Sequence, residues 1–117
     1  MSEFLVFIEV RRPANTPDAE WASLLEREAA RGREYRISGI ISRIWRVPGT
    51  RQNIGIWEAA DATELHARIS ALPMFDHMSI EVRPLALHYL ETYARTVTGR
   101  TRPKSAGGGS SAWKDTE

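Results

Sequence analysis

The sequence predicts an α+β fold in which a four-stranded antiparallel sheet carries two helices on one face. Runs of β-branched and aromatic residues alternate with stretches of helical periodicity, in the order strand, helix, strand, strand, helix, strand. A Pro-Gly turn joins the two middle strands, which predicts a hairpin. This order is that of the split βαβ, or ferredoxin-like, arrangement, and 117 residues suffice for one such domain.

The first strand is predicted over residues 4–10, which are rich in β-branched and aromatic side chains. A helix follows, with Thr16 expected to cap its free N–H groups and Pro17 to fit its first turn. This helix is expected to run toward Tyr35. Its apolar positions Trp21 and Leu25 share one face, as helical periodicity requires.

The second and third strands are predicted over residues 40–47 and 53–58, on either side of the turn at Pro48-Gly49. A second helix begins at the capping-box-like sequence from Asp61 to Glu64 and ends before Pro73. The fourth strand is predicted over residues 79–87. Pro84 places part of this strand at a sheet edge or a bulge.

Residues 1–93 are expected to form the domain, and residues 94–117 a flexible basic tail that contains Gly and Ser. Trp113 either shares the disorder of this tail or docks on a neighbouring subunit. Two helices can cover only one face of the sheet, and Trp45 and Trp57 add to the apolar surface. The uncovered face therefore predicts a homodimer at least.

Composition excludes several classes of function. The absence of cysteine excludes disulfides, thiolate nucleophiles and cysteine-bound metals. Residues 95–117 hold five Lys and Arg against two acids, or +3, so the net charge of +1 leaves −2 for the domain, which argues against nucleic-acid binding. The apolar run at residues 4–10 is too short for a signal peptide or a membrane span, so a cytoplasmic protein without membrane contact is expected.

Cofactor and metal motifs are also missing from the sequence. The histidines His66, His77 and His88 show no spacing typical of a metal centre, so no metal is expected. No Gly-rich strand-to-helix fingerprint for dinucleotides and no nucleophile elbow of serine hydrolases is present.

Glu28 stands out because helical periodicity aims it at the core, within about 20° of the centre of the apolar stripe of the first helix. A buried unpaired carboxylate is costly, so Glu28 is expected to be paired, protonated or facing a cavity. Pairing with Arg31, Arg43 or Arg46, or extension to the helix edge, is the structural alternative. In a cavity it would be a candidate base for proton transfer.

Two sequence blocks resemble the muconolactone Δ-isomerase family and its chloromuconolactone-dehalogenating relatives, over roughly residues 3–90. One is Trp45-Arg46-x-x-Gly49 with Asn53 four residues beyond the glycine, and the other is Leu72-Pro73-Met74-Phe75. The resemblance implies a cofactor-free proton shift in a butenolide acetic acid, catalysed by a dimeric α/β barrel assembled into larger rings. It places Glu28 at the catalytic glutamate and Asn53 at the asparagine that donates to the lactone or enolate oxygen. Asn53 as a turn residue bonding its own backbone is the alternative.

The sequence departs from the resemblance between Gly49 and Asn53, where the relatives usually carry a histidine and a tyrosine. This chain has Thr50, Arg51 and Gln52 there. Arg51 is expected either to bind a substrate carboxylate or phosphate, lowering the pKa of a nearby Glu28, or to point to solvent. Further substrate-binding candidates are Thr50, Trp45, Phe75 and His77, the last being either an acid–base partner or a loop residue.

The leading hypothesis is therefore a cofactor-independent isomerase that shifts a proton in a small unsaturated lactone or a related carboxylate. The same proton shuttle also suits elimination or cyclisation in a catabolic or natural-product pathway. A cofactor-free monooxygenase or polyketide-tailoring enzyme on the same fold is an alternative. A non-catalytic binding or assembly module is another, because fold alone does not determine chemistry.

Overall fold

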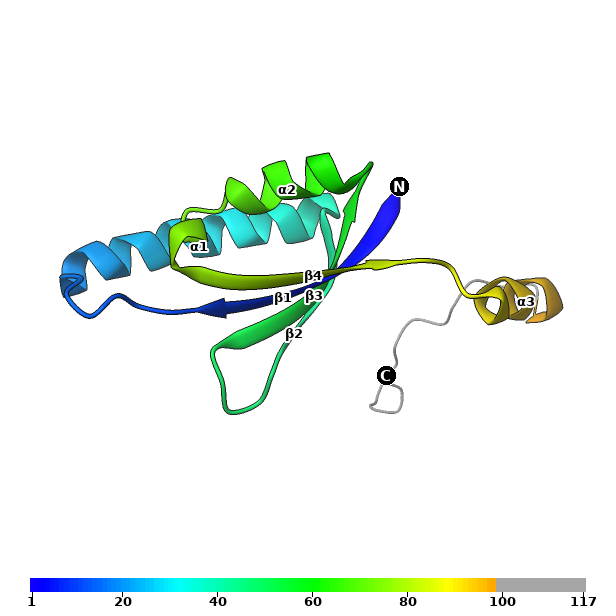
Figure 1. The fold of residues 1–117 in the computed structure, drawn as a ribbon, viewed down its shortest axis with the longest axis horizontal. Coiled ribbons are helices and arrows are strands. Elements are labelled where there is room, and N and C mark those ends of the chain that lie inside the picture. Colours follow the sequence, from blue (N-terminus) through cyan, green and yellow to red (C-terminus); the bar gives the residue numbers. More distant parts are fainter. Residues whose placement is uncertain (99–117) are drawn as a thin grey trace. The chain divides into compact units, whose positions relative to one another are not determined.

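The structure, a computed structural model that describes residues 1–98, has the predicted order of elements in its main body (Figure 1). One helix follows the first strand and another follows the third, and a short 3₁₀ turn precedes the last strand. Their bounds are β1 Ser2–Val10, α1 Asp18–Ser38, β2 Ile41–Arg46, β3 Gln52–Ala59, α2 Ala62–Ser70, η1 Phe75–His77 and β4 Met78–Leu85. The predicted α+β class is confirmed.

The four strands form one antiparallel sheet in the order β2-β3-β1-β4. The register shifts in β2 between Ile41 and Arg43, which marks a bulge. Both α1 and α2 lie on the same side of the sheet (Figure 1). β4 is an edge strand, which agrees with the meaning of Pro84 in the sequence, because proline cannot donate to a neighbouring strand.

Side-chain alternation divides the sheet into two apolar faces. The face toward the helices, which we call the helix face, carries Phe4, Val6, Ile8 and Trp57, each no more than 5% exposed, and they pack with residues of α1 and α2. The opposite side, which we call the open face, carries Leu5, Phe7, Trp45, Ile54 and Ile56, paired across the strands. No helix of the main body covers the open face (Figure 1).

Helix α1 begins differently from the prediction. Pro17 occupies the N-cap position with extended backbone, and no side chain within residues 1–98 caps the helix, so the expected capping by Thr16 is wrong. The Arg12 side chain binds this end of the helix instead. Its guanidinium donates to the carbonyl of Thr16 at 2.8 Å and to the carboxylate of Asp18 at 2.5 Å, at the end where an acidic residue complements the helix dipole. The helix ends at Gly39, whose φ of 87° favours glycine.

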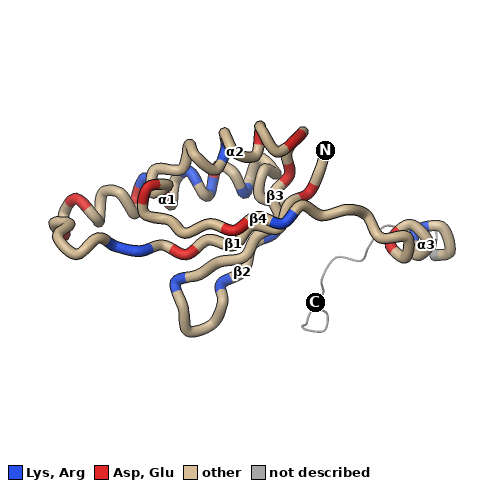
Figure 2. Tube along the Cα trace, in the orientation of Figure 1, with Lys and Arg blue, Asp and Glu red and all other residues tan. Residues whose placement is uncertain are grey.

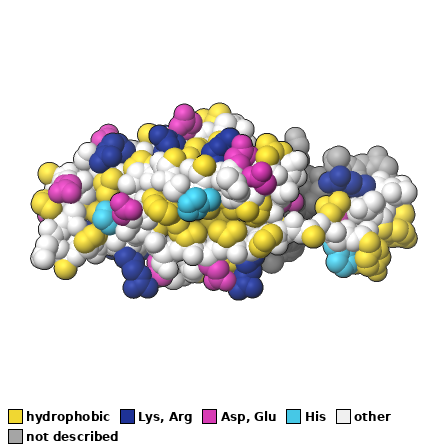
Figure 3. Space-filling model, turned by 45° about the horizontal axis from the view of Figure 1, so that its top comes forward, with side chains coloured by type: hydrophobic (Ala, Val, Ile, Leu, Met, Phe, Trp, Pro, Cys, Tyr) yellow, Lys and Arg dark blue, Asp and Glu magenta, His cyan; other side chains and the backbone are white. Residues whose placement is uncertain are grey.

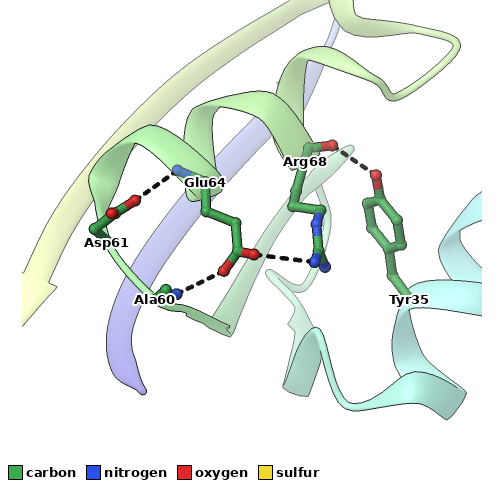
Figure 4. A network of polar contacts seen from close by, with 5 residues as sticks. All are labelled: Tyr35, Ala60, Asp61, Glu64 and Arg68. Carbon is green, nitrogen blue, oxygen red and sulfur yellow. Dashed lines mark hydrogen bonds and ion pairs between the residues drawn. The ribbon is translucent and has the colours of Figure 1, made fainter.

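Helix α2 begins with the predicted capping box (Figure 4). The Asp61 carboxylate accepts the backbone N–H of Glu64 at 2.9 Å, and the Glu64 carboxylate accepts the N–H of Ala60 at 2.6 Å. Glu64 also binds Arg68 one turn later, at 3.3 Å. The hydroxyl of Tyr35, from α1, donates to the carbonyl of Arg68 at 2.8 Å and so joins the two helices.

The C-terminal part contains a helix that the sequence did not predict. The last strand ends at Leu85, two residues earlier than expected. The main body, Met1–Ala86, is one compact unit, and a second unit starts at Leu87. This unit contains α3, Tyr89–Thr98, which overlaps the start of the expected tail. The rest of that tail, including Trp113, lies outside the described residues. Within residues 1–98 no helix has the length and apolarity needed to cross a membrane.

Candidate active site

A cavity of about 590 Å³ lies between α1 and the helix face of the sheet, at the end where the β2–β3 hairpin closes. Side chains from β1, α1, β2 and β3 and from the connection between α2 and β4 form its wall. Most are apolar, and the polar ones are Arg12, Glu28, Arg46, Thr50, Arg51 and Asn53. The cavity is large enough for a small organic acid and has a single carboxylate in its wall.

Glu28 is the half-buried carboxylate of this cavity. Its Oε1 accepts the backbone N–H of Met74 at 3.0 Å. Burial raises the pKa of Glu28, and the hydrogen bond from Met74 and the positive charge of Arg31 lower it only in part. The carboxylate is therefore easier to protonate than an ordinary glutamate, as a proton-transfer base requires.

No guanidinium neutralises Glu28 among the described residues, so the ion-pair alternatives do not hold. Arg31 forms its ion pair with Glu34 at 3.2 Å and donates to the carbonyl of Ala71 at 3.1 Å. Arg43 lies over the ring of Trp45 at 4.9 Å, on the open face. Glu28 is thus held by one backbone donor and faces the cavity.

Asn53 and Trp57 lie on the helix face of β3, and both line the cavity. The buried Oδ1 of Asn53 and the buried Nε1 of Trp57 have no hydrogen-bond partner within the described part of the chain. Buried polar atoms are usually bonded, so two orphaned atoms in one cavity wall indicate a place for a polar ligand. The alternative for Asn53, a turn residue bonded to its own backbone, does not occur.

The β2–β3 hairpin brings cations to the cavity, and Figure 2 shows basic residues on both of its arms. Arg51 is exposed and forms no ion pair or hydrogen bond within residues 1–98. Arg46 makes one long hydrogen bond, 3.4 Å, to the carbonyl of Gln52. The hydroxyl of Thr50 is occupied by the turn, because it donates to the carbonyl of Val47 at 2.9 Å and accepts the N–H of Gln52 at 3.0 Å.

Three of the predicted site residues lie outside this cavity. Trp45 belongs to the open face, because it is the strand neighbour of the cavity residue Arg46 and points the other way. Phe75 lines a separate apolar groove of about 440 Å³ between α2 and β4, where Figure 3 shows hydrophobic side chains around a histidine. His77 lies beside the ring of Trp21, with centroids 5.7 Å apart, in another shallow pocket.

The sequence analysis did not assign Arg12 to the site. It lies two residues beyond the end of β1, and no motif in the sequence pointed to it. Trp57 was expected to add to the uncovered apolar surface, but it is 1% exposed on the helix face, because it stands four residues after Asn53 and therefore on the same strand face. No group of three His, Asp or Glu side chains that could hold a metal ion occurs in the part of the chain that the structure describes.

Comparison with known proteins agrees with this geometry. The family model of muconolactone delta-isomerase matches residues 2–91. The chain belongs to that family. The muconolactone Delta-isomerase of Cupriavidus pinatubonensis (strain JMP 134 / LMG 1197) is 34% identical over 85 residues, covering 73% of this chain and 92% of the relative. That of Rhodococcus opacus is 34% identical over 88 residues, covering 75% and 95%.

A solved structure supports the same assignment. The crystal structure of muconolactone isomerase at 3.3 Å resolution superposes with a TM-score of 0.69 at 27% sequence identity, covering 74% of this chain and 90% of that chain. The ferredoxin-like fold of this muconolactone delta-isomerase family member is therefore that of a known isomerase. The family match ends at residue 91, so most of α3 lies beyond it.

Proposed function

We propose that this protein is a cofactor-independent isomerase of the muconolactone type, in which Glu28 moves a proton within a small unsaturated lactone that bears a carboxylate. The observation that carries the proposal is the position of Glu28. Its carboxylate lines an otherwise mostly apolar cavity, burial raises its pKa, and its only hydrogen bond within the described residues is to Met74 through one oxygen. The second carboxylate oxygen is available to the substrate.

The chemistry needs a base that first accepts a proton and then returns it. In a butenolide, Glu28 removes a proton from a ring carbon, and the electron pair of the broken C–H bond moves through the conjugated system to the lactone carbonyl oxygen. The resulting enolate takes the same proton back at another ring carbon, so the double bond moves and no atom is gained or lost. A carboxyl group with a raised pKa suits both halves, because it holds the proton more firmly between them.

Asn53 is placed in this proposal at the developing oxyanion. Its side chain lies in the same cavity wall and has an unpaired buried atom, so the amide is free to turn its N–H₂ toward a ligand oxygen. A donor aimed at such an oxygen typically contributes a factor of about 10² to 10³ in kcat.

Arg51 is placed at the substrate carboxylate. It reaches the cavity from the hairpin, is exposed, and has no acidic partner within residues 1–98. Arg46, on the opposite arm of the hairpin, adds a second positive charge. A guanidinium binds a carboxylate through two parallel hydrogen bonds, which fixes the orientation of the ring over Glu28.

Incubation of the protein with muconolactone in deuterated water tests the proposal. We expect isomerisation, with deuterium entering the product to the extent that the Glu28 proton exchanges with solvent. Glu28→Gln keeps an oxygen that accepts the Met74 N–H but removes the base, so kcat should fall by about 10² to 10⁴. Glu26→Gln, at an exposed position of the same helix, is the matched control. Full activity of folded Glu28→Gln would reject the mechanism.

We also propose that the open face is the contact between two copies of the chain. Its apolar side chains include Trp45, which is 44% exposed, and Leu5, Phe7, Ile54 and Ile56, which are partly exposed. An apolar sheet face of this kind usually marks an interface in a soluble oligomer. Ile54→Arg should therefore lower the mass measured by light scattering, whereas Ile37→Arg, at a position 86% exposed on α1, should not.

A further inference from the structure

The indole N–H of Trp57 is a buried donor with no acceptor. Trp57 is 1% exposed and lines the Glu28 cavity, and its Nε1 has no hydrogen-bond partner among the described residues. An indole nitrogen can only donate, so its partner must be an acceptor atom. Burying it without a partner costs free energy that a phenylalanine would avoid, which suggests that the acceptor is a ligand.

The absence of a side chain at Gly55 lets this N–H lie close to β3, because a Cβ there would crowd the indole nitrogen. Asn53, Gly55 and Trp57 follow one another on the helix face of β3, about 6.8 Å apart at each step. A Cβ placed on Gly55 would lie 3.2 Å from the backbone carbonyl oxygen of Arg43, 3.3 Å from Nε1 of Trp57 and 3.5 Å from Cγ1 of Ile44. The indole therefore leans along the strand, with its N–H over Gly55 and on the side of Asn53.

A ligand oxygen can reach this N–H only if a neighbouring side chain moves, because Nε1 of Trp57 is buried. Ile44, the side chain next to the same space, is 43% exposed and has room to change rotamer. Tyr35 holds the indole from the other layer through an edge contact, with ring centroids 5.6 Å apart. The core thus fixes the indole of Trp57, and Ile44 is the neighbouring side chain that can move.

On the basis of the function proposed above, we propose that Trp57 is a second catalytic hydrogen-bond donor, which binds the lactone carbonyl oxygen together with Asn53. When Glu28 takes the ring proton, the electron pair arrives on that oxygen, where the two neutral donors stabilise it. The charged arginines remain available for the substrate carboxylate. The site would therefore bind the two kinds of substrate oxygen with different groups. The neutral donors would bind the enolate oxygen, and the guanidinium groups would bind the carboxylate oxygens.

Nuclear magnetic resonance tests the contact directly. The full chain with Glu28→Gln is labelled with ¹⁵N and titrated with muconolactone, which it should bind without converting. Its four tryptophans give four indole signals, and Trp57→Phe in the same background identifies the relevant one. We expect the Trp57 indole proton to shift downfield more than the other three. A Trp57 signal that moves no more than the others at saturation overturns the proposal.

Kinetics provide the second test. Trp57→Phe retains an aromatic ring against Tyr35 but loses the N–H, so kcat should fall roughly 10²-fold with little change in KM. Gly55→Ala retains the N–H but puts a methyl group 3.3 Å from it, and should abolish the downfield shift. Ile69→Val, which truncates a buried core residue of α2 outside the cavity, is the control for loss of packing and should keep its kcat.

The outcomes separate this inference from the proposed function. Folded Trp57→Phe with unchanged kcat overturns the donor role while the isomerase stands. A wild-type protein that shows the indole shift but does not isomerise muconolactone overturns the proposed reaction and keeps the Trp57 contact.

Discussion

Replacing Tyr35 by phenylalanine should destabilise the protein by a predictable amount. The hydroxyl of Tyr35 donates to the carbonyl of Arg68 at 2.8 Å, and Tyr35 itself is 6% exposed (Figure 4). Arg68 lies in the last turn of α2, where carbonyls lack the usual partner four residues later; the N–H of Leu72 bonds Ile69 instead. The mutation therefore removes a hydrogen bond and leaves a carbonyl short of a partner.

The expected loss follows from these two effects. A typical hydrogen bond contributes about 0.5–1.5 kcal/mol, and an acceptor left unsatisfied raises the cost toward about 2 kcal/mol. For a domain of this size each kcal/mol lowers Tm by about 4–8 °C. Urea unfolding followed by circular dichroism should show a lower midpoint with an unchanged slope, because the surface exposed on unfolding is the same.

The control is Tyr89→Phe, in which the same hydroxyl is lost from a side chain that is 71% exposed on α3. It should change the free energy of unfolding by less than about 0.5 kcal/mol. Equal midpoints for Tyr35→Phe and wild type would show that the contact between α1 and α2 contributes nothing, and would refute the reasoning.

Four further predictions concern the cavity and its hairpin. Burial raises the folded-state pKa of Glu28 above its ordinary 4.5, so between these two pKa values the folded protein binds more protons than the unfolded chain. The free energy of unfolding should therefore fall as pH rises from the ordinary pKa through the raised one. Glu28→Gln should remove this part of the dependence of stability on pH. By the same shift, kcat/KM for muconolactone should rise with pH through the raised pKa, and a flat profile would exclude Glu28 as the base. Arg51→Ala should raise KM by roughly 10- to 100-fold with kcat nearly unchanged, since charged hydrogen bonds contribute about 1.5–3 kcal/mol, whereas Arg27→Ala, outside the cavity, should leave KM as it is. Gly49→Ala should cost about 1–2 kcal/mol in urea unfolding because Gly49 has a φ of 80°.

Local patterns in the sequence were enough to predict the main body. The order of strands and helices follows from short runs of periodic residues. The capping box at Asp61 and the edge position of Pro84 each follow from a few neighbouring residues. The expected cap by Thr16 was wrong. The Arg12 side chain, which donates to the Thr16 carbonyl and the Asp18 carboxylate, lies outside the helix, and helical periodicity does not describe its contacts. Helix α3 was missed because its residues were taken together with the Gly-rich segment that follows them.

The candidate site was predictable only in part, for a geometric reason. The helical stripe aimed Glu28 inward, and the structure puts it in a cavity with Asn53, Thr50 and Arg51. Strand alternation turns Trp45 away from the cavity, and the turn before β4 places Phe75 in another groove. Both residues were therefore wrongly expected in this cavity. The backbone donor at Met74 is 46 residues from Glu28 in the chain, and no local pattern indicates such a contact.

The bond between Glu28 and the N–H of Met74 has a consequence for divergence within the family. The partner of the carboxylate is main chain, so every amino acid except proline at position 74 still supplies it. Point substitutions around the cavity can accordingly change its shape to fit other organic acids, while the Glu28 carboxylate keeps its orientation. Insertions or deletions in residues 71–77 are the changes that would move that N–H, so this segment should tolerate variation in residue type and resist variation in length.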